Sequence, residues 1–92
     1  MASGQVWQIE FNADAARDLR KLDATAQRLI LRYLRERIAT TEDPRRFGRP
    51  LMGDWRGFWR YRVGDYRMVA SIEDDRFIVL VVTVGHRREV YD

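Results

Sequence analysis

Hydrophobic and polar residues alternate along residues 6–11, and this period of two predicts a strand that is buried on one face. Trp7, Ile9 and Phe11 share the buried face. The apolar spacing then changes to four and three residues, at Ala15, Leu19 and Leu22. That spacing predicts a short helix over residues 13–22.

A second helix is predicted by an apolar stripe between Leu29 and Ile38 that repeats close to the helical period. Asn12 is placed to cap the first helix, and either Asp23 or Thr25 can cap the second. Because the linker between them is minimal, we expect the two helices to form a hairpin on one face of a sheet.

Three strands are predicted after a long connection, 40–57, which proline and glycine interrupt. Residues 58–63 alternate, Gly64-Asp65 is typical of a two-residue hairpin turn, and 66–72 return. A second turn is predicted to pair Glu73 with Arg76, before an apolar central strand over 77–84 that Gly85 ends. The order β-α-α-β-β-β predicts an α+β fold with a mainly antiparallel sheet.

Charge is concentrated in the long connection and the first predicted hairpin. The chain has 92 residues, which predicts one domain over 1–92, and its net charge is +3. Lys21 is the single lysine among 17 basic residues. Residues 44–72 carry seven arginines and two acids, a net charge of +5, whereas 1–43 are neutral and 73–92 carry −2. This excess favours a polyanionic partner.

Three of these arginines are predicted to share one face of the first hairpin. The two-residue turn places Arg62 opposite Arg67 and Arg60 opposite Val69, and opposed residues share a face. The other face, directed towards the core, is predicted to hold Trp59, Tyr61 and Met68.

Two interpretations of this arginine cluster are open. Directly opposed like charges destabilise a hairpin by roughly 0.2–1 kcal/mol per pair. A phosphodiester would relieve that repulsion, because guanidinium groups bind phosphate bidentately. Alternatively, the three arginines are solvated, with one of them paired to Asp65 or Glu73.

The arginines of the second helix receive a different interpretation. Arg28, Arg32 and Arg35 lie off the apolar stripe, and Glu36 follows Arg32 by four residues. This spacing is typical of a solvated helix face with a surface ion pair.

The C-terminal segment adds acid–base and stacking groups. With the pairing predicted for the second turn, His86 falls on the face of Arg67. His86 is the only histidine, and histidine is the side chain whose unperturbed pKa suits proton transfer near neutrality. Arg87 adds charge, and Tyr91 adds a ring that can stack on a base or transfer a proton.

Several other chemistries have no signal in the sequence. It contains no phosphate-binding glycine loop, dinucleotide fingerprint or nucleophile elbow, and with one histidine and no cysteine we expect neither a metal nor a cofactor. The N-terminal residues do not form a signal peptide, and the longest apolar run is too short to span a bilayer. A cytoplasmic protein without a membrane partner is the expectation.

The order of elements and two motifs carry a family resemblance. The motifs are GFWRYRVGDYRMV at 57–69 and VGHRREVYD at 84–92. Together with WQIEFNADAARDLRKLD near the N-terminus, they resemble the RelE toxins of the RelE/ParE superfamily over nearly the whole chain. The resemblance implies a type II toxin–antitoxin system in which the toxin enters the ribosomal A site and cuts mRNA. It also implies a RelB-like antitoxin that neutralises the toxin in a hetero-oligomer.

The resemblance also implies roles for individual residues. Arg60 and Arg62 match basic strand residues near the scissile phosphate, and Arg67 matches the arginine that stabilises its charge. Arg87 matches the residue proposed to protonate the leaving group, and Tyr91 the aromatic residue that stacks on or activates the nucleotide.

Some relatives carry lysines where this chain has Arg60 and Arg62. Arginine does not lose its proton, so these two residues are expected to stabilise charge rather than act as a base. The expected base is His86 or Tyr91, unless orientation of the RNA by the ribosome makes a base dispensable. The expected reaction is attack by the 2′-hydroxyl on the adjacent phosphorus, without a metal.

Two alternatives belong to other functional classes. A ParE-like toxin would bind and poison DNA gyrase without cutting RNA, and an inactive domain would only bind an antitoxin. ParE toxins generally lack the basic–aromatic set seen here, which favours the ribonuclease.

Overall fold

Two side-chain caps begin the helices at the residues that the sequence predicts. The computed structural model describes residues 4–86. The side chain of Asn12 accepts a hydrogen bond from the Ala15 amide at 2.8 Å and begins α1 (Ala13–Arg20). Asp23, rather than Thr25, accepts from the Ala26 amide at 2.8 Å and begins α2 (Ala24–Tyr33). The predicted helical hairpin is therefore confirmed, although α1 ends at Arg20 rather than at 22.

The second helix does not end as an α-helix. It continues into a π-helical turn, η1 (Leu34–Ile38), in which the Ala39 amide donates to the Leu34 carbonyl at 2.8 Å. This turn widens the helix, so residues four apart are no longer stacked as in an α-helix.

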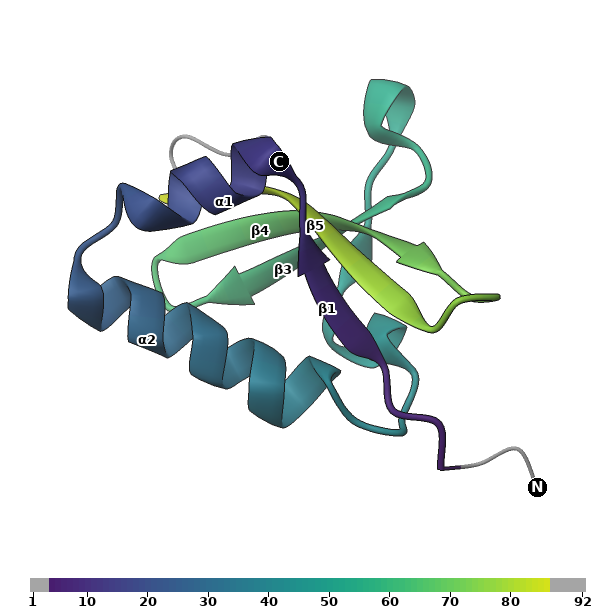
Figure 1. The fold of residues 1–92 in the computed structure, drawn as a ribbon. Coiled ribbons are helices and arrows are strands. Elements are labelled where there is room, and N and C mark those ends of the chain that lie inside the picture. Colours follow the sequence, from purple (N-terminus) through teal and green to yellow (C-terminus); the bar gives the residue numbers. More distant parts are fainter. Residues whose placement is uncertain (1–3, 87–92) are drawn as a thin grey trace.

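A five-stranded sheet lies beside the helices in the order β1-β5-β4-β3-β2 (Figure 1). Its strands are β1 (Gln8–Phe11), β2 (Arg49–Pro50), β3 (Phe58–Val63), β4 (Tyr66–Glu73) and β5 (Ile78–His86). β1 pairs parallel with β5, and the other neighbours pair antiparallel, so the predicted α+β fold is confirmed. None of the helices within residues 4–86 is long and apolar enough to cross a membrane.

The connection predicted over 40–57 contains structure that the sequence pattern did not show. It holds the short strand β2 and two 3-10 turns, η2 (Pro44–Phe47) and η3 (Gly53–Trp55). The Tyr61 hydroxyl donates to the Pro44 carbonyl at 2.9 Å and ties η2 to the core. The teal segment around η3 extends away from the sheet (Figure 1).

The main core lies between the helices and one face of the sheet. Tyr61 and Met68 are buried in it and Trp59 packs against it, as predicted. Its buried members come from both helices and the strands: Trp7, Ala15, Ile30, Leu34, Ile38, Tyr61, Val63, Met68, Ala70, Val79, Val81 and Val84.

Within residues 4–86, neither α1 nor α2 covers the opposite face of the sheet, which we call the helix-free face. A small second cluster covers one part of it, where buried Leu51 and Val69 pack with Trp55, Phe58 and Val82. Because Arg60 pairs directly with Val69, the arginines of β3 share this helix-free face.

The pairing of β4 with β5 differs from the sequence prediction. Glu73 pairs with Ile78 rather than Arg76, so the turn is two residues longer than predicted. A β-bulge then shifts the register, because Val69 pairs with Thr83 and Ala70 with Val81. Val82, between Val81 and Thr83, is the extra residue of β5.

The longer turn moves the pairing of β5 by two residues, so its side chains up to Val81 stay on their predicted faces. The bulge moves the pairing by one residue more, so the side chains of 83–86 lie on the face opposite to the predicted one. Accordingly Val79, Val81 and Val84 all lie in the main core despite their mixed spacing. The strand also runs on through Gly85 to His86, beyond its predicted end.

Candidate functional site

Two arginines face each other at the turn end of the β3–β4 hairpin. Arg62 and Arg67 are direct partners, as the two-residue turn predicts. Arg67 lies on the central strand β4, with Arg62 on one side and Gly85 of β5 on the other. Gly85 places no side chain next to Arg67 on that strand. Arg67 is only 8% exposed, whereas Arg62 is exposed.

A second arginine pair lies two residues further along β3. Arg60 pairs with Arg49 of β2, so the side chains of Arg49, Arg60, Arg62 and Arg67 all project from the helix-free face. We call these four residues the arginine face. Successive residues on one side of a strand are roughly 7 Å apart, which sets the separation of the two pairs.

Two arginine pairs opposed in this way repel each other, and strand pairing gives them little freedom to separate. Within residues 4–86, neither Arg49 nor Arg62 forms an ion pair. A guanidinium presents a planar set of donors that matches a phosphate. The arginine face is therefore suited to bind an anion with more than one phosphate.

Arg49 was not predicted from the sequence, because β2 lies in a connection without hydrophobic periodicity. The sequence feature that indicates a strand at Arg49 is the following Pro50, because a residue before proline favours an extended backbone. Gly48 permits the close packing of this strand. A Cβ atom there would lie 3.0 Å from the Tyr61 ring, so a larger residue would displace the segment.

Two other arginines of the +5 segment are neutralised by acids. The Arg45 guanidinium donates to Asp74 at 2.6 Å and to Asp43 at 3.2 Å, and the hydrogen bond to Asp74 raises the pKa of Arg45 above its ordinary value. Arg46 pairs with Glu42. These contacts hold the long connection in place and engage Arg45 and Arg46 with acidic side chains.

The predicted face of His86 is wrong. His86 pairs directly with Tyr66, and their rings lie 5.9 Å apart at 78°. Tyr66 in turn pairs with core residue Val63, so His86 projects from the helix-bearing face rather than beside Arg67. The bulge in β5 is the physical reason. Arg87 and Tyr91 lie outside the described residues.

The surface ion pair predicted for the second helix is also absent. Within the described part of the chain, Arg32 forms no ion pair with Glu36, and neither Arg28 nor Arg35 forms one. Glu36 lies in the π-helical turn, whose wider geometry alters the spacing on which such a pair depends.

The residues between 4 and 86 contain no group of three histidine, aspartate or glutamate side chains that could hold a metal ion. The cations of the arginine face can bind negative charge and stabilise it.

A family model described as the ParE toxin of type II toxin–antitoxin systems matches residues 9–91. The chain belongs to this toxin family. Two relatives from Mycobacterium tuberculosis are similar along almost their whole length. Toxin RelG is 28% identical over 85 residues, which cover 92% of this chain and 95% of RelG. Toxin RelE is 29% identical over 91 residues, which cover 99% and 92%. The identification as a RelE-type toxin of this family is confirmed.

Solved structures agree with this placement. The RelBE2 toxin–antitoxin complex from M. tuberculosis contains a chain that matches with a TM-score of 0.83 and 27% identity, covering 94% of this chain and 97% of that one. A chain of the E. coli RelBE complex matches with a TM-score of 0.66 and 20% identity, covering 87% and 95%. At that identity the second match shows the shared fold alone.

Proposed function

We propose that this chain is the toxin of a type II toxin–antitoxin system and acts as a ribosome-dependent endoribonuclease that cuts mRNA. The observation that carries the proposal is the arginine face, where two directly opposed pairs crowd four cations onto the helix-free side of the sheet. Its relatives named RelE and RelG support the same class of toxin. Translation is then the process inhibited, and the cytoplasm is the site of action.

Arg67 is the proposed centre of charge stabilisation. It is buried on the central strand, so its guanidinium is held more rigidly than that of exposed Arg62. When the 2′-hydroxyl attacks, the phosphorus becomes pentacoordinate and gains negative charge. Arg60, Arg62 and Arg67 stabilise that charge, and preorganised cations act most strongly where water is partly excluded.

The second arginine pair extends the RNA path. Arg49 lies beside Arg60 at a separation of two strand residues from the first pair. A positively charged groove that follows the backbone is a recurring way to bind a single strand. We assign Arg49 to a phosphate next to the scissile one, where it positions the RNA.

Proton transfer requires other residues, because arginine stays protonated. His86 projects from the face opposite the arginines, which leaves Tyr91 as the candidate from the sequence to accept the 2′-hydroxyl proton. Arg87 is the candidate to assist departure of the 5′-oxygen. The RNA supplies its own nucleophile and the arginines supply positive charge, so this route requires no metal.

The partner in this proposal is an antitoxin protein that binds and neutralises the chain. The solved RelBE2 structure of the relative is a toxin–antitoxin complex. The toxin and its antitoxin then form a hetero-oligomer, while the free toxin binds the ribosomal A site and mRNA.

A test of the function uses the wild-type chain induced in bacteria, with mRNA 5′ ends mapped by primer extension. We expect cuts in phase with codons, only in translated mRNA. Intact mRNA during growth arrest contradicts the ribonuclease.

The alternative of a gyrase poison is retained because the matching family model is that of ParE toxins. The same induced cells report on it through plasmid supercoiling. Altered supercoiling with intact mRNA supports gyrase inhibition, and growth without either effect supports an inactive antitoxin-binding domain.

A further inference from the structure

Two aromatic side chains lie on the helix-free face beside the arginine face. The ring centroids of Trp55 and Phe58 are 5.4 Å apart at 80°, so the edge of one ring contacts the face of the other. Trp55 ends η3, and Phe58 begins β3. We call these two residues the aromatic pair.

The aromatic pair continues the line of the arginines along β3. Phe58, Arg60 and Arg62 are two residues apart, so their side chains project from one face of the sheet. Trp55 packs with Phe58 and Val69, and Val69 is the strand partner of Arg60, which places Trp55 on the same face. Successive positions on one side of a strand are roughly 7 Å apart. The two arginine pairs are therefore followed, at the same interval, by the aromatic pair.

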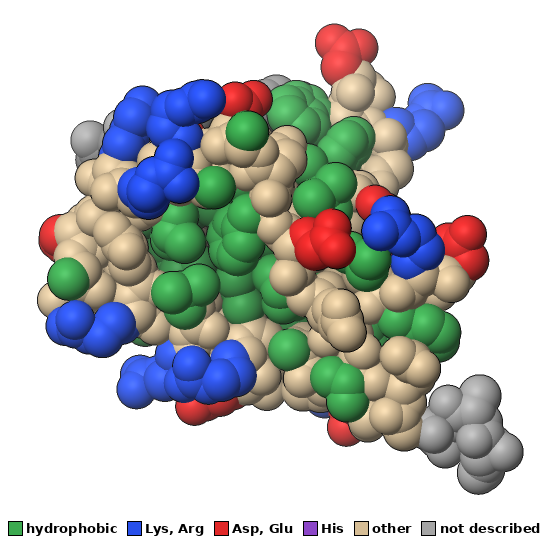
Figure 2. All heavy atoms as spheres, viewed as in Figure 1, with side chains coloured by type: hydrophobic (Ala, Val, Ile, Leu, Met, Phe, Trp, Pro, Cys, Tyr) green, Lys and Arg blue, Asp and Glu red, His purple; other side chains and the backbone are tan. Residues whose placement is uncertain are grey.

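Packing holds the aromatic pair in place and leaves part of it accessible. Leu51 is buried, whereas the Trp55 and Phe58 side chains that pack with it are only partly buried. The Leu51 amide donates to the Phe58 carbonyl at 3.0 Å and joins the connection to the start of β3. Figure 2 shows acidic and basic side chains at the end of the segment that extends away from the sheet. Asp54 and Arg56 are exposed, so Trp55 packs towards the sheet while its neighbours in sequence face solvent.

A row of guanidinium groups that ends at aromatic rings matches the chemistry of a single-stranded nucleic acid. The arginines bind phosphates, and aromatic rings stack on bases. In an edge-to-face pair, the ring that contributes its edge keeps both faces outside the contact with its partner. A nucleobase is planar and weakly hydrated on its faces, so it suits this position better than a phosphate does.

We propose that the aromatic pair is a stacking platform for one base of the RNA, beyond the phosphate assigned to Arg49. Trp55 and Phe58 bind substrate there and fix the position of the RNA along the arginine face. They take no part in proton transfer. The choice of mRNA as the ligand rests on the proposed function. The platform is additional to Tyr91, which lies outside the described residues.

The test measures the affinity of the full chain for ribosomes that carry an uncleavable mRNA. A 2′-O-methyl group at the nucleotide mapped as the cut site blocks the attacking hydroxyl. Bases around that nucleotide are removed one at a time, which leaves each sugar and phosphate in place. At one position we expect the affinity of the wild type to fall by about 5- to 150-fold, the equivalent of about 1–3 kcal/mol for stacking on an aromatic ring.

Variants then distinguish the platform from other contacts of the same base. Trp55→Leu keeps an apolar side chain in the cluster but removes the ring, and we expect the loss caused by base removal to be at least about threefold smaller. Trp55→Phe keeps a ring and should retain most of the loss. Met52→Ala is the matched control, because Met52 is 75% exposed in the same connection and carries no ring. It should respond to base removal as the wild type does.

The melting temperature of each variant is recorded, because the aromatic pair also packs in the second cluster. If Trp55→Leu does not fold, Phe58→Leu takes its place. Equal losses in the wild type and the folded leucine variant, or no loss at any position, would overturn the platform. A wild type that cuts unmodified mRNA while showing either result contradicts the platform alone. A wild type that leaves unmodified mRNA intact contradicts the proposed ribonuclease, and the platform is rejected with it.

Discussion

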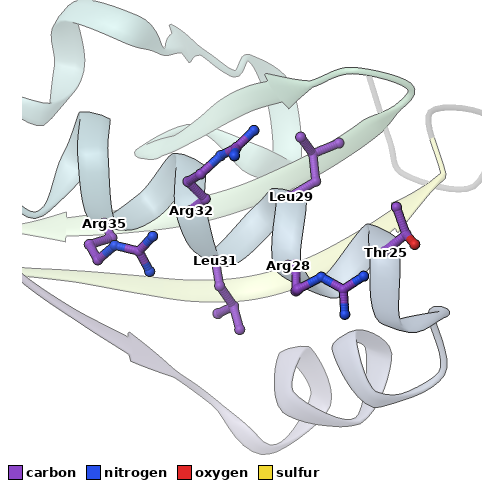
Figure 3. Close-up of a pocket in the computed structure, with 6 residues that line it drawn as sticks. All are labelled: Thr25, Arg28, Leu29, Leu31, Arg32 and Arg35. Atoms are coloured by element: carbon purple, nitrogen blue, oxygen red, sulfur yellow. The ribbon is translucent and has the colours of Figure 1, made fainter.

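Arginines form two surfaces of this chain, and the two surfaces differ in how they are held. On the arginine face, strand pairing places Arg49 beside Arg60 and Arg62 beside Arg67. On the outer side of α2, by contrast, Arg28, Arg32 and Arg35 belong to one helical element and its π-helical continuation. They line a shallow hollow together with Thr25, Leu29 and Leu31 (Figure 3).

This difference bears on what the two surfaces can bind. Opposed arginines on paired strands form an array of donors whose spacing the strands fix, which suits phosphates along an RNA strand. The arginines of α2 lie between the exposed Leu29 and Leu31, and no paired strand fixes their spacing. Residue type alone therefore does not identify the ligand.

The largest expected effect comes from Arg67, which only the first surface contains. Arg67→Ala is expected to lower mRNA cleavage by about 100- to 1,000-fold, because a preorganised charge is lost at the reacting phosphate. The measurement is the cleavage rate on purified ribosomes carrying a defined mRNA. Because Arg67 is buried, antitoxin affinity and melting temperature are recorded as tests of folding.

Arg67→Lys provides a second variant that keeps the positive charge but not the planar set of donors. We expect it to retain part of the activity. A folded Arg67→Ala protein that cleaves at the wild-type rate would remove Arg67 from the mechanism.

A smaller effect distinguishes the surfaces by their response to salt. Each arginine that contacts a phosphate of single-stranded RNA contributes about 0.7 to the slope of log affinity against log salt concentration. Arg49→Ala and Arg62→Ala are each expected to lower the slope by that amount in binding to ribosome-bound mRNA. Arg28→Ala should leave it unchanged. Equal slopes for all three variants would contradict the division between the surfaces.

The Asp23 side chain caps α2, the helix that carries the second surface, and its removal changes the stability of that helix. Asp23→Ala removes the hydrogen bond to the Ala26 amide and is expected to cost roughly 1 kcal/mol of stability. Denaturant unfolding measures the loss. Because strand pairing holds the arginine face independently of this cap, the salt dependence of RNA binding should not change. Asp14→Ala, which removes an exposed pair with Arg17, is the control and should cost less.

The weakest effect near neutral pH concerns Tyr61, whose hydroxyl anchors the connection that leads to Arg49. Burial raises the pKa of Tyr61 above its ordinary value. The folded chain then retains this proton at a pH where the unfolded chain has lost it. The free energy of unfolding is therefore unaffected below about pH 10 and falls by up to about 1.4 kcal/mol per pH unit above it.

Tyr61→Phe should remove most of this alkaline loss, as measured by denaturant unfolding between neutral and alkaline pH. Tyr33, whose pKa burial also raises, retains a share. If the free energy of unfolding of Tyr61→Phe falls with rising alkaline pH as steeply as that of the wild type, ionisation of Tyr61 is not the cause of the fall. Near neutrality this variant loses only the hydrogen bond to Pro44, worth about 1 kcal/mol.

Much of the fold follows from local patterns. Asn12 and Asp23 begin the helices because a capping side chain needs only the next few amides. The helical spacing also placed Ile38 correctly in the core, whereas Leu29, at the start of the predicted stripe, is 37% exposed. The π-helical turn escaped prediction, because its residues have the apolar spacing of an ordinary helix.

The sequence by itself determined the placement of Arg60, Arg62 and Arg67 on one face, because a two-residue turn at Gly64-Asp65 sets the register of both adjoining strands. Only the tertiary structure decided the other two features of the site. Arg49 joined it through the pairing of β2 with β3, and a bulge in β5 turned His86 to the opposite face. Both depend on which distant strand a segment pairs with and where that pairing slips. Contacts of the whole sheet govern those choices, and no short stretch of sequence contains them.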